Sequence, residues 1–208
     1  LRLLGPNSMG VADLNARTLL TVNAVYTEPD PLAGHIGLIS QSGSMMGGLI
    51  ARARSLGIGF SRIAAVGNEC DLGVPEIGAM MLEDPQTSVI TLFLETLRDP
   101  DGLARFASAA HAAGKPVVAF KLGRSALGQQ MAVAHTGALL SEDAVADAFL
   151  RDIGIARVRT LEGLIEAPAL FAGRAPLGRD RPRVGVLTTT GGGGATVCDC
   201  LALEGVEI

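Results

Sequence analysis

Short hydrophobic runs rich in β-branched residues recur along the chain and alternate with segments that have helical spacing. The runs are continuous rather than alternating, as expected for parallel strands that helices cover on both faces. Strands are expected at 35–40, 61–66, 88–94, 116–121 and 154–158. Helices are expected at 43–55, 72–83, 101–113, 142–152 and 161–172.

The number and order of these elements predict the type of sheet. Successive strand–helix units build an open, doubly wound parallel sheet with right-handed crossovers. The alternative order has six strands around a G-x-G-x-x-G turn. Five predicted strands without such a turn favour the flavodoxin-like order instead. Residues 34–175 are therefore predicted to form an α/β domain of this kind. A further strand at 183–189 and a helix at 195–203 predict the start of a second similar domain, residues 182–208.

Composition narrows the class of protein. The 208 residues carry a formal net charge of -4, so no basic surface for nucleic acid is predicted. No apolar run approaches the roughly 20 residues of a membrane helix, and no secretory leader is visible. The three cysteines are read as free thiols, and the protein is expected to be cytoplasmic. Because it begins without methionine and stops within a strand–helix unit, the chain is expected to be a fragment.

Polar residues of unusual type follow the predicted strands. The sequence Ser40–Gly43 follows the first strand, Gly67–Glu69 follows the second, and Glu95 follows the third. Asp71, shortly after Glu69, is placed to cap the next helix. His135 lies in a predicted loop after the fourth. In an open parallel sheet ligands bind beyond the carboxyl ends of the strands. We therefore expect these residues to meet at one edge of the sheet.

Two predicted helix starts have the composition of anion sites. One is Ser40, Gln41, Ser42 and Gly43, and the other is Gly191, Gly192, Gly193 and Gly194. Free N–H groups at a helix start favour an anion, and glycine lets the backbone approach it closely. An ordinary serine N-cap is the alternative for the first.

His135 and Glu95 form a coherent pair for phosphoryl transfer. A neutral imidazole is a nucleophile, and a carboxylate can accept the hydrogen bond from its other nitrogen and stabilise the charge that develops. The alternatives are a solvated loop histidine, and an acid that pairs with Arg98 or faces solvent. His35 and His111 are read as structural or exposed.

Several short motifs together resemble the NDP-forming acyl-CoA synthetases, relatives of succinyl-CoA synthetase and ADP-forming acetate–CoA ligase. The resemblance covers essentially the whole chain, and the order and spacing of the motifs carry it. They are Gly5-Pro6-Asn7, Ser40-Gln41-Ser42-Gly43, Gly67-Asn68-Glu69, Lys115-Pro116-Val117-Val118 and His135-Thr136-Gly137-Ala138.

The resemblance implies roles for particular residues. His135 corresponds to the histidine that is phosphorylated, and Glu95 to the acid that holds it. The turns at 40–43 and 191–194 resemble the starts of two helices that face the phosphohistidine. Asn7 and Ser8 fall near the CoA and acyl site, and residues 1–33 correspond to the end of a CoA-binding domain and a linker. The residues that could line the site are Asn68, Glu69, Thr136 and Gly137.

The implied reaction joins a carboxylic acid to CoA with cleavage of NTP to NDP and phosphate, through an acyl phosphate and a phosphohistidine. CoA and ATP or ADP are then substrates, and the nucleotide, with Mg, belongs to ATP-grasp domains or a subunit outside these residues. No bound cofactor or metal is expected in this chain, and a homo- or hetero-oligomer is implied.

Two other functions stay open at this point. Some relatives are fused to a protein acetyltransferase and use the synthetase-like part as a sensor. The second alternative is a flavodoxin-like module that binds phosphate or flavin. Aromatic residues make up only 3% of the chain, however, and offer little to stack on a flavin.

Overall fold

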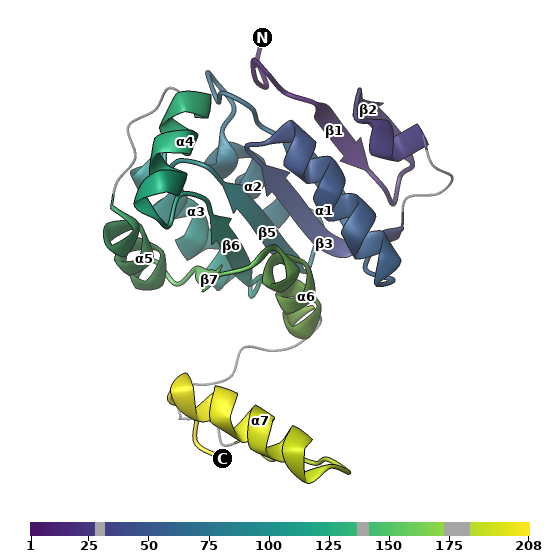
Figure 1. The fold of residues 1–208 in the computed structure, drawn as a ribbon. Coiled ribbons are helices and arrows are strands. Elements are labelled where there is room, and N and C mark those ends of the chain that lie inside the picture. Colours follow the sequence, from purple (N-terminus) through teal and green to yellow (C-terminus); the bar gives the residue numbers. More distant parts are fainter. Residues whose placement is uncertain (28–31, 137–141, 173–183) are drawn as a thin grey trace. The chain divides into compact units, whose positions relative to one another are not determined.

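A seven-stranded mixed sheet forms the centre of the larger part of the molecule (Figure 1). The computed structural model describes residues 1–27, 32–136, 142–172 and 184–208, and the side chains of 132–136 are not described. The strand order is β2-β1-β4-β3-β5-β6-β7. The strands are β1 (Gly10–Asp13), β2 (Thr18–Thr21), β3 (Ala33–Ser40), β4 (Phe60–Ala65), β5 (Val89–Leu94), β6 (Val117–Lys121) and β7 (Ala156–Val158).

The parallel part of the sheet confirms the predicted flavodoxin-like order. Strands β3 to β7 run parallel, and in their own chain order they are arranged 2-1-3-4-5. The five strands lie where the hydrophobic runs predicted them, within two residues at each end. The switch in strand order lies between β3 and β5, and ligands bind at such switch points in open α/β sheets.

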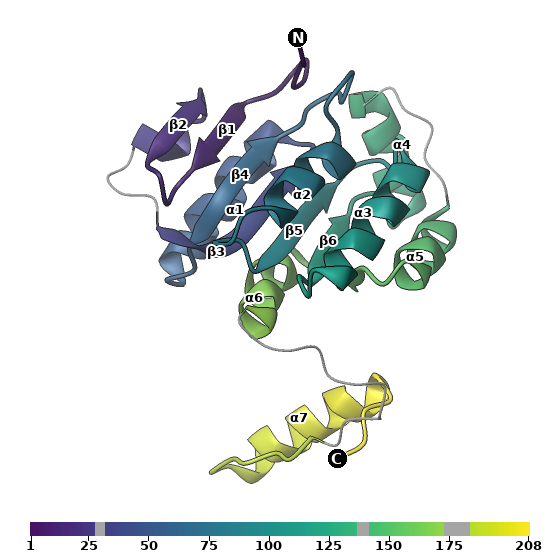
Figure 2. The same cartoon turned by 180° about the vertical axis from the view of Figure 1, so that it is seen from behind.

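Helices cover both faces of the sheet. Helices α1 (Gly43–Ser55) and α6 (Leu161–Phe171) lie on one face, and α2 (Val74–Leu82) and α3 (Pro100–Ala112) on the other (Figures 1 and 2). Strand β5 is buried throughout and serves both cores: Leu92 belongs to the cluster under α2 and α3, and Phe93 to the cluster under α1. Burial of both faces explains why the strands read as continuous apolar runs.

The amino-terminal residues differ from the sequence prediction. No strand was predicted at 11–33, but β1 and β2 form an antiparallel hairpin, and β1 pairs antiparallel with β4. A short 3-10 helix follows at Ala24–Thr27. The strands are only four residues long and β2 is mostly exposed, so their sequence carries little periodic signal.

The segment that contains His135 also differs from prediction. A helix, α4 (Ala126–Thr136), occupies positions where a loop was expected. The next helix, α5 (Asp143–Asp152), confirms the prediction for 142–152.

The start of α2 differs from prediction as well. Asp71, expected to cap α2, instead accepts hydrogen bonds from Arg2 and the Leu3 N–H, and Gly73 is the N-cap.

Contacts divide the chain into two units, Leu1–Arg174 and Ala175–Ile208. The second unit contains α7 (Gly191–Leu203), which begins four residues before the predicted start. Its predicted strand at 183–189 is wrong for the residues described, because 184–190 form none. A strand needs a neighbour for its backbone groups, and no described strand pairs with this segment.

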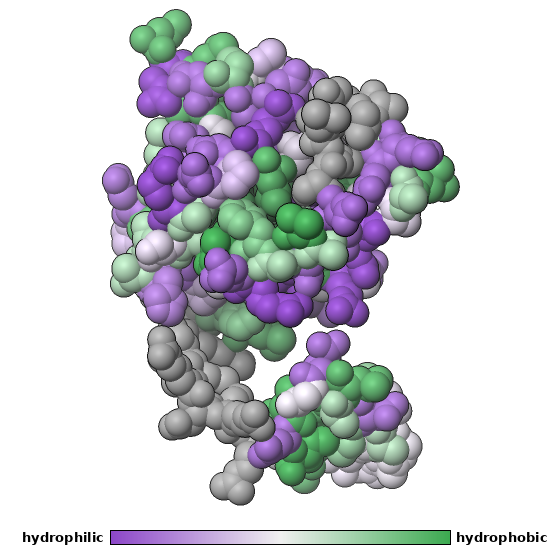
Figure 3. Space-filling view, turned by 90° about the vertical axis from the view of Figure 1, so that its left-hand side faces the viewer, coloured by the Kyte–Doolittle hydropathy of each residue, from purple (hydrophilic) through white to green (hydrophobic). Residues whose placement is uncertain are grey.

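The side of the molecule that carries α4 and α5 mixes hydrophilic and hydrophobic surface (Figure 3). Exposed apolar residues of these helices include Leu127, Met131 and Val145. Among the described helices, none has the length and apolar character to cross a membrane.

Candidate functional site

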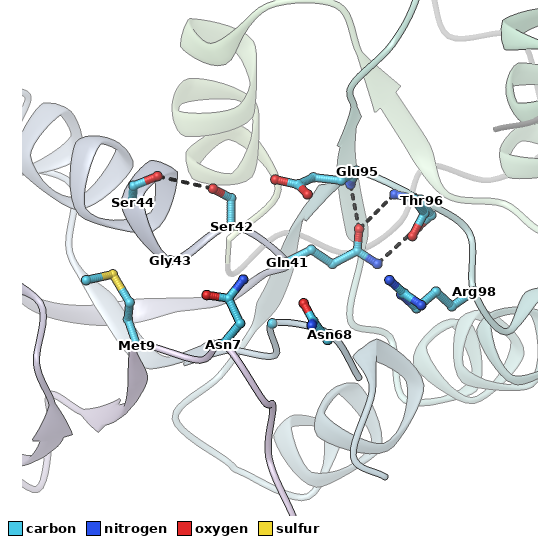
Figure 4. Close-up of a pocket in the computed structure, with 11 residues that line it drawn as sticks. Asn7, Met9, Gln41, Ser42, Gly43, Ser44, Asn68, Glu95, Thr96 and Arg98 are labelled. Atoms are coloured by element: carbon cyan, nitrogen blue, oxygen red, sulfur yellow. Dashed lines mark hydrogen bonds between the residues drawn. The ribbon is translucent and has the colours of Figure 1, made fainter. Parts of the chain in front are cut away.

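A pocket of about 250 Å³ opens beyond the carboxyl ends of β3, β4 and β5, at the switch in strand order. The three loops that leave these strands line it together with the amino-terminal segment (Figure 4). The edge of the sheet predicted from the sequence is therefore the edge that carries the pocket. The lining residues are Asn7, Met9, Gln41, Ser42, Gly43, Ser44, Gly67, Asn68, Glu95, Thr96 and Arg98.

The turn after β3 presents the start of α1 to the pocket. Ser42 is the N-cap, and its hydroxyl accepts from the Met45 N–H at 3.4 Å and lies 3.4 Å from the Ser44 hydroxyl. The first N–H groups of a helix have no partner within it, so Gly43 and Ser44 provide donors at the positive end of the helix dipole. This turn has the groups that an anion requires.

Ser40 has a different place from Ser42. Its side chain is completely buried, and its hydroxyl donates to the Ser42 carbonyl at 2.7 Å and accepts from the Ser42 N–H at 3.2 Å. Ser40 is absent from the lining of the described pocket. It therefore shapes the turn from below rather than facing the cavity.

Glu95 enters the pocket from the end of β5. The residue is 7% exposed and follows the last residue of the strand, Leu94. Its carboxylate points toward the side of the pocket formed by Ser42 and Ser44 (Figure 4). A carboxylate and a donor-rich helix start therefore face the same cavity, as the sequence predicted.

The loop after β4 forms a third wall. Gly67 has a φ of 60°, and a Cβ there would lie 2.3 Å from the Pro6 carbonyl oxygen, so the close approach requires glycine. The Asn68 N–H donates to that carbonyl at 2.9 Å, which holds the amino-terminal segment against the loop and places Asn7 at the pocket. The Ser8 hydroxyl is engaged with the Ala65 carbonyl at 2.5 Å.

Glu69 lies behind this wall. Its side chain is 6% exposed and 4.0 Å from the Arg98 guanidinium. Burial raises the pKa of Glu69, against the opposing effects of hydrogen bonds from the Val74 N–H and the Gln41 amide. The Glu69 carboxylate therefore supports the loops around the pocket and is not among the residues that line it.

Lys121 is a buried cation near the same edge. It ends β6, is 3% exposed, and donates to the Leu122 carbonyl at 2.7 Å. Burial and the neighbouring charge of Arg157 lower its pKa, whereas the carboxylates of Asp143 and Glu95 act in the opposite direction. Lys121 is the last residue of the strand predicted at 116–121, and the sequence assigned it no role.

Three predicted site residues, His135, Thr136 and Gly137, fall at the end of α4 or directly after it in the sequence. The backbone of His135 and Thr136 belongs to the last turn of α4, their side chains lie outside the described residues, and so does Gly137. No group of metal-binding side chains is present among the residues that are described.

The four glycines of the second predicted anion site form the first turn of α7. Thr190 is the N-cap, and its hydroxyl accepts from the Gly193 N–H at 3.2 Å. A Cβ at Gly191 or Gly192 would have no atom within 4 Å. Within its own unit this helix start is open.

Sequence reasoning missed four lining residues, Met9, Ser44, Thr96 and Arg98, as members of the site. Arg98 had been considered only as a partner for Glu95. Ser44, Thr96 and Arg98 each lie within three residues of a predicted site residue, so widening those motifs would have found them. Met9 directly follows the predicted residues Asn7 and Ser8, so the same widening would have found it, although its contact with Gly43 is long-range in sequence.

Comparison with known proteins agrees with this arrangement. The family described as succinyl-CoA ligase like flavodoxin domain matches residues 33–171. ADP-forming acetate–CoA ligase from Methanocaldococcus jannaschii is 31% identical over 201 residues, which are 96% of this chain and 27% of that protein. The alpha subunit of ADP-forming acetate–CoA ligase I from Pyrococcus furiosus is 32% identical, over 100% of this chain and 44% of the subunit.

A solved structure gives the same picture. The apo form of the dinucleotide forming acetyl-coenzyme A synthetase 1 of Ca. Korarchaeum cryptofilum superimposes with a TM-score of 0.88 at 28% identity, over 100% of this chain and 44% of that one. The chain thus spans less than half the length of these relatives. The family match covers most of the chain and includes the pocket loops at 40–44, 67–69 and 95–98. The chain therefore belongs to the NDP-forming acyl-CoA synthetases, with a succinyl-CoA ligase like flavodoxin domain.

Proposed function

We propose that this chain is the phosphoryl-handling part of an enzyme that forms acyl-CoA from a carboxylic acid, CoA and NTP. The observation that carries the proposal is the pocket in which the start of α1, two serine hydroxyls and the Glu95 carboxylate converge. None of the lining residues of the described pocket is aromatic, which argues against a flavin site.

The phosphoryl group is held at the start of α1. The N–H groups of Gly43 and Ser44 and the hydroxyls of Ser42 and Ser44 donate to its oxygens, and the helix dipole compensates their charge. The lining also contains one cationic side chain, Arg98, among the described residues. Within the second unit, Gly191–Gly194 make a donor-rich helix start with the backbone groups that a phosphate requires.

His135 is the nucleophile in this proposal. In the thioester-consuming direction, phosphate attacks the acyl-CoA carbonyl and the CoA thiolate leaves. The acyl phosphate then transfers its phosphoryl group to an imidazole nitrogen of His135, and the carboxylate is released. The phosphohistidine finally gives the group to NDP and forms NTP. Glu95 accepts the hydrogen bond of the other imidazole nitrogen and stabilises the imidazolium.

The complete enzyme is proposed to include parts that these 208 residues lack. CoA, the carboxylic acid and the nucleotide are its substrates, and ATP-grasp domains, on the same chain or on a partner subunit, bind the nucleotide with Mg. The chain alone is therefore expected not to form acyl-CoA. NTP-dependent acyl-CoA formation by the isolated chain would contradict this division of labour.

The test is to incubate the complete enzyme with γ-labelled NTP and to map the modified residue. Acid-labile, base-stable label on His135 is expected, with no label in His135→Ala. His111→Ala is the matched control, since His111 is an exposed histidine of α3. Label on another residue, or undiminished label in His135→Ala, would refute the proposal.

A further inference from the structure

Gln41 lies in the proposed phosphate-binding turn, but its side chain amide is already fully used within the protein. The Oε1 atom accepts from the Glu95 N–H at 2.5 Å and from the Thr96 N–H at 2.9 Å. The Nε2 atom donates to the Thr96 carbonyl at 3.0 Å and to Glu69 Oε1 at 2.5 Å. A carboxamide has two acceptor sites and two donors, so none is left for a phosphoryl oxygen.

The four partners also fix how the amide is oriented. Two backbone N–H groups require an oxygen opposite them, and a carbonyl and a carboxylate require a nitrogen. The exchanged orientation would place donor against donor and acceptor against acceptor. Gln41 is 8% exposed, so loss of these bonds would leave buried polar groups without partners.

This side chain joins two loops across the switch point of the sheet. Gln41 follows β3, whereas Glu95 and Thr96 follow β5, 54 and 55 residues later in the sequence. At this point the chain turns toward α1 on one face and toward α3 on the other (Figures 1 and 2). The Gln41 amide bonds to the backbone of residues 95 and 96 just beyond the last pair of the β5 ladder, and this fixes the direction in which the Glu95 side chain leaves the strand (Figure 4).

Glu69 holds Gln41 from the third loop. Its Oε2 atom accepts from the Val74 N–H at 2.9 Å while Oε1 accepts from Gln41. Glu69 has a φ of 51°, an unusual backbone conformation for this residue type, and it turns the loop after β4 toward Gln41. The loops after β3, β4 and β5 are thus connected through a single amide.

We propose that Gln41 is a positioning residue, not a phosphate ligand: it clamps the backbone at Glu95 and Thr96, with Glu69 as its support, and so aims the Glu95 carboxylate into the pocket. This inference rests on the proposed function of the pocket. It separates Ser42 and Gly43, which bind the anion in the proposed function, from Gln41, which orients the carboxylate.

The first test measures the clamp itself and needs no activity. Hydrogen exchange of the Glu95 and Thr96 amides is followed in the complete enzyme, in wild type and in Gln41→Met. Exchange at both amides is expected to rise at least about tenfold in the variant, because these N–H groups lose their acceptor. Gln86→Met, at an exposed glutamine, is the control and leaves it unchanged. Unchanged exchange in Gln41→Met would overturn the clamp.

The second test separates positioning from binding. In Gln41→Met the single-turnover rate of phosphoenzyme formation from γ-labelled ATP is expected to fall about tenfold or more, as for a misplaced catalytic group. The dissociation constant of inorganic phosphate, measured by calorimetry, stays within about twofold, because no ligand is removed. A tenfold weaker phosphate affinity with a normal rate would make Gln41 a ligand and overturn the proposal.

A pair of variants covers the case in which Gln41→Met does not fold. Gln41→Glu keeps acceptors for the Glu95 and Thr96 N–H groups but places a carboxylate oxygen against Glu69 and the Thr96 carbonyl. The double variant Gln41→Glu/Glu69→Gln restores a donor between positions 69 and 41, and it is expected to recover part of the labelling rate lost in Gln41→Glu, at the same phosphate affinity as Gln41→Glu. Absence of recovery contradicts the clamp. If wild type takes no label, the proposed function fails, and the exchange measurement alone decides the role of Gln41.

Discussion

Two helix starts in this chain offer similar backbone groups but have different surroundings. Both α1 and α7 begin with a hydroxyl N-cap, Ser42 or Thr190, that accepts from an N–H in the first turn. At α1 three loops and the amino-terminal segment surround that start and add the Glu95 carboxylate. At α7, within its unit, Gly191 and Gly192 have open space around them. The elements that enclose the α1 start therefore add a carboxylate and other polar side chains that the helix start alone does not supply.

The largest expected effect comes from removing what distinguishes the α1 site. Glu95→Gln in the complete enzyme is expected to lower phosphoenzyme formation about 100-fold or more, because the imidazolium loses its counter-charge. Rapid-quench labelling measures the rate, and Glu166→Gln on the exposed side of α6 is the control. A rate equal to that of wild type would place Glu95 outside the chemistry.

The second comparison uses the first glycine of each helix. In Gly43→Ala the new Cβ would lie 2.3 Å from Met9 Cγ, so Met9 must move, and a loss of about 1–3 kcal/mol in the free energy of unfolding is expected. Gly191→Ala meets no atom within 4 Å and should be neutral or gain up to about 1 kcal/mol. Urea unfolding of the chain checks both, and equal effects would mean that α1 is not enclosed as described.

The two N-caps give a third, smaller contrast. Ser42→Ala and Thr190→Ala should each destabilise their own helix by about 1 kcal/mol, since each loses one capping bond. Only Ser42→Ala is expected to weaken the binding of inorganic phosphate to the chain, by about tenfold for a lost bond to a charged group. Calorimetry with phosphate measures this, and equal weakening by both variants would contradict the assignment of the anion to the start of α1.

The smallest effect concerns Glu69 behind the α1 site. Because burial raises its pKa, the folded state binds this proton more tightly than the unfolded chain does, and stability falls as pH rises through the folded pKa. The free energy of unfolding of wild type minus that of Glu69→Gln is therefore highest below pH 4.5 and falls as the pH rises toward neutral. Urea titrations across this range measure it, and a difference that grows with pH has the wrong sign.

Most of the sheet could be predicted because burial on both faces imposes continuous apolar runs. Helix α1 was placed correctly at 43–55, since Ser42 and Gly43 mark its start clearly. The β1–β2 hairpin was missed because its strands are short and its edge is exposed. Helix α4 was missed because its residues lack a strong amphipathic pattern, although Ser125 directly before it accepts from the Gly128 N–H at 3.0 Å, as an N-cap does.

The candidate site could be predicted as a location but not as a set of contacts. Position after a parallel strand was enough to bring Ser42, Asn68 and Glu95 to one pocket. The bonds of Gln41 to residues 95 and 96 depend on which strands are neighbours, and that information is not local in sequence. The four glycines at 191–194 carry a signal for close approach, and the described residues of their own unit leave Gly191 and Gly192 open.

The central claim is that the start of α1 binds the phosphoryl group, and a crystal structure of the complete enzyme with inorganic phosphate tests it most directly. Phosphate is predicted within hydrogen-bond distance of the Gly43 and Ser44 N–H groups and the Ser42 hydroxyl. The Gln41 amide should remain on the backbone of Glu95 and Thr96. Phosphate bound elsewhere while the α1 pocket stays empty would contradict the account.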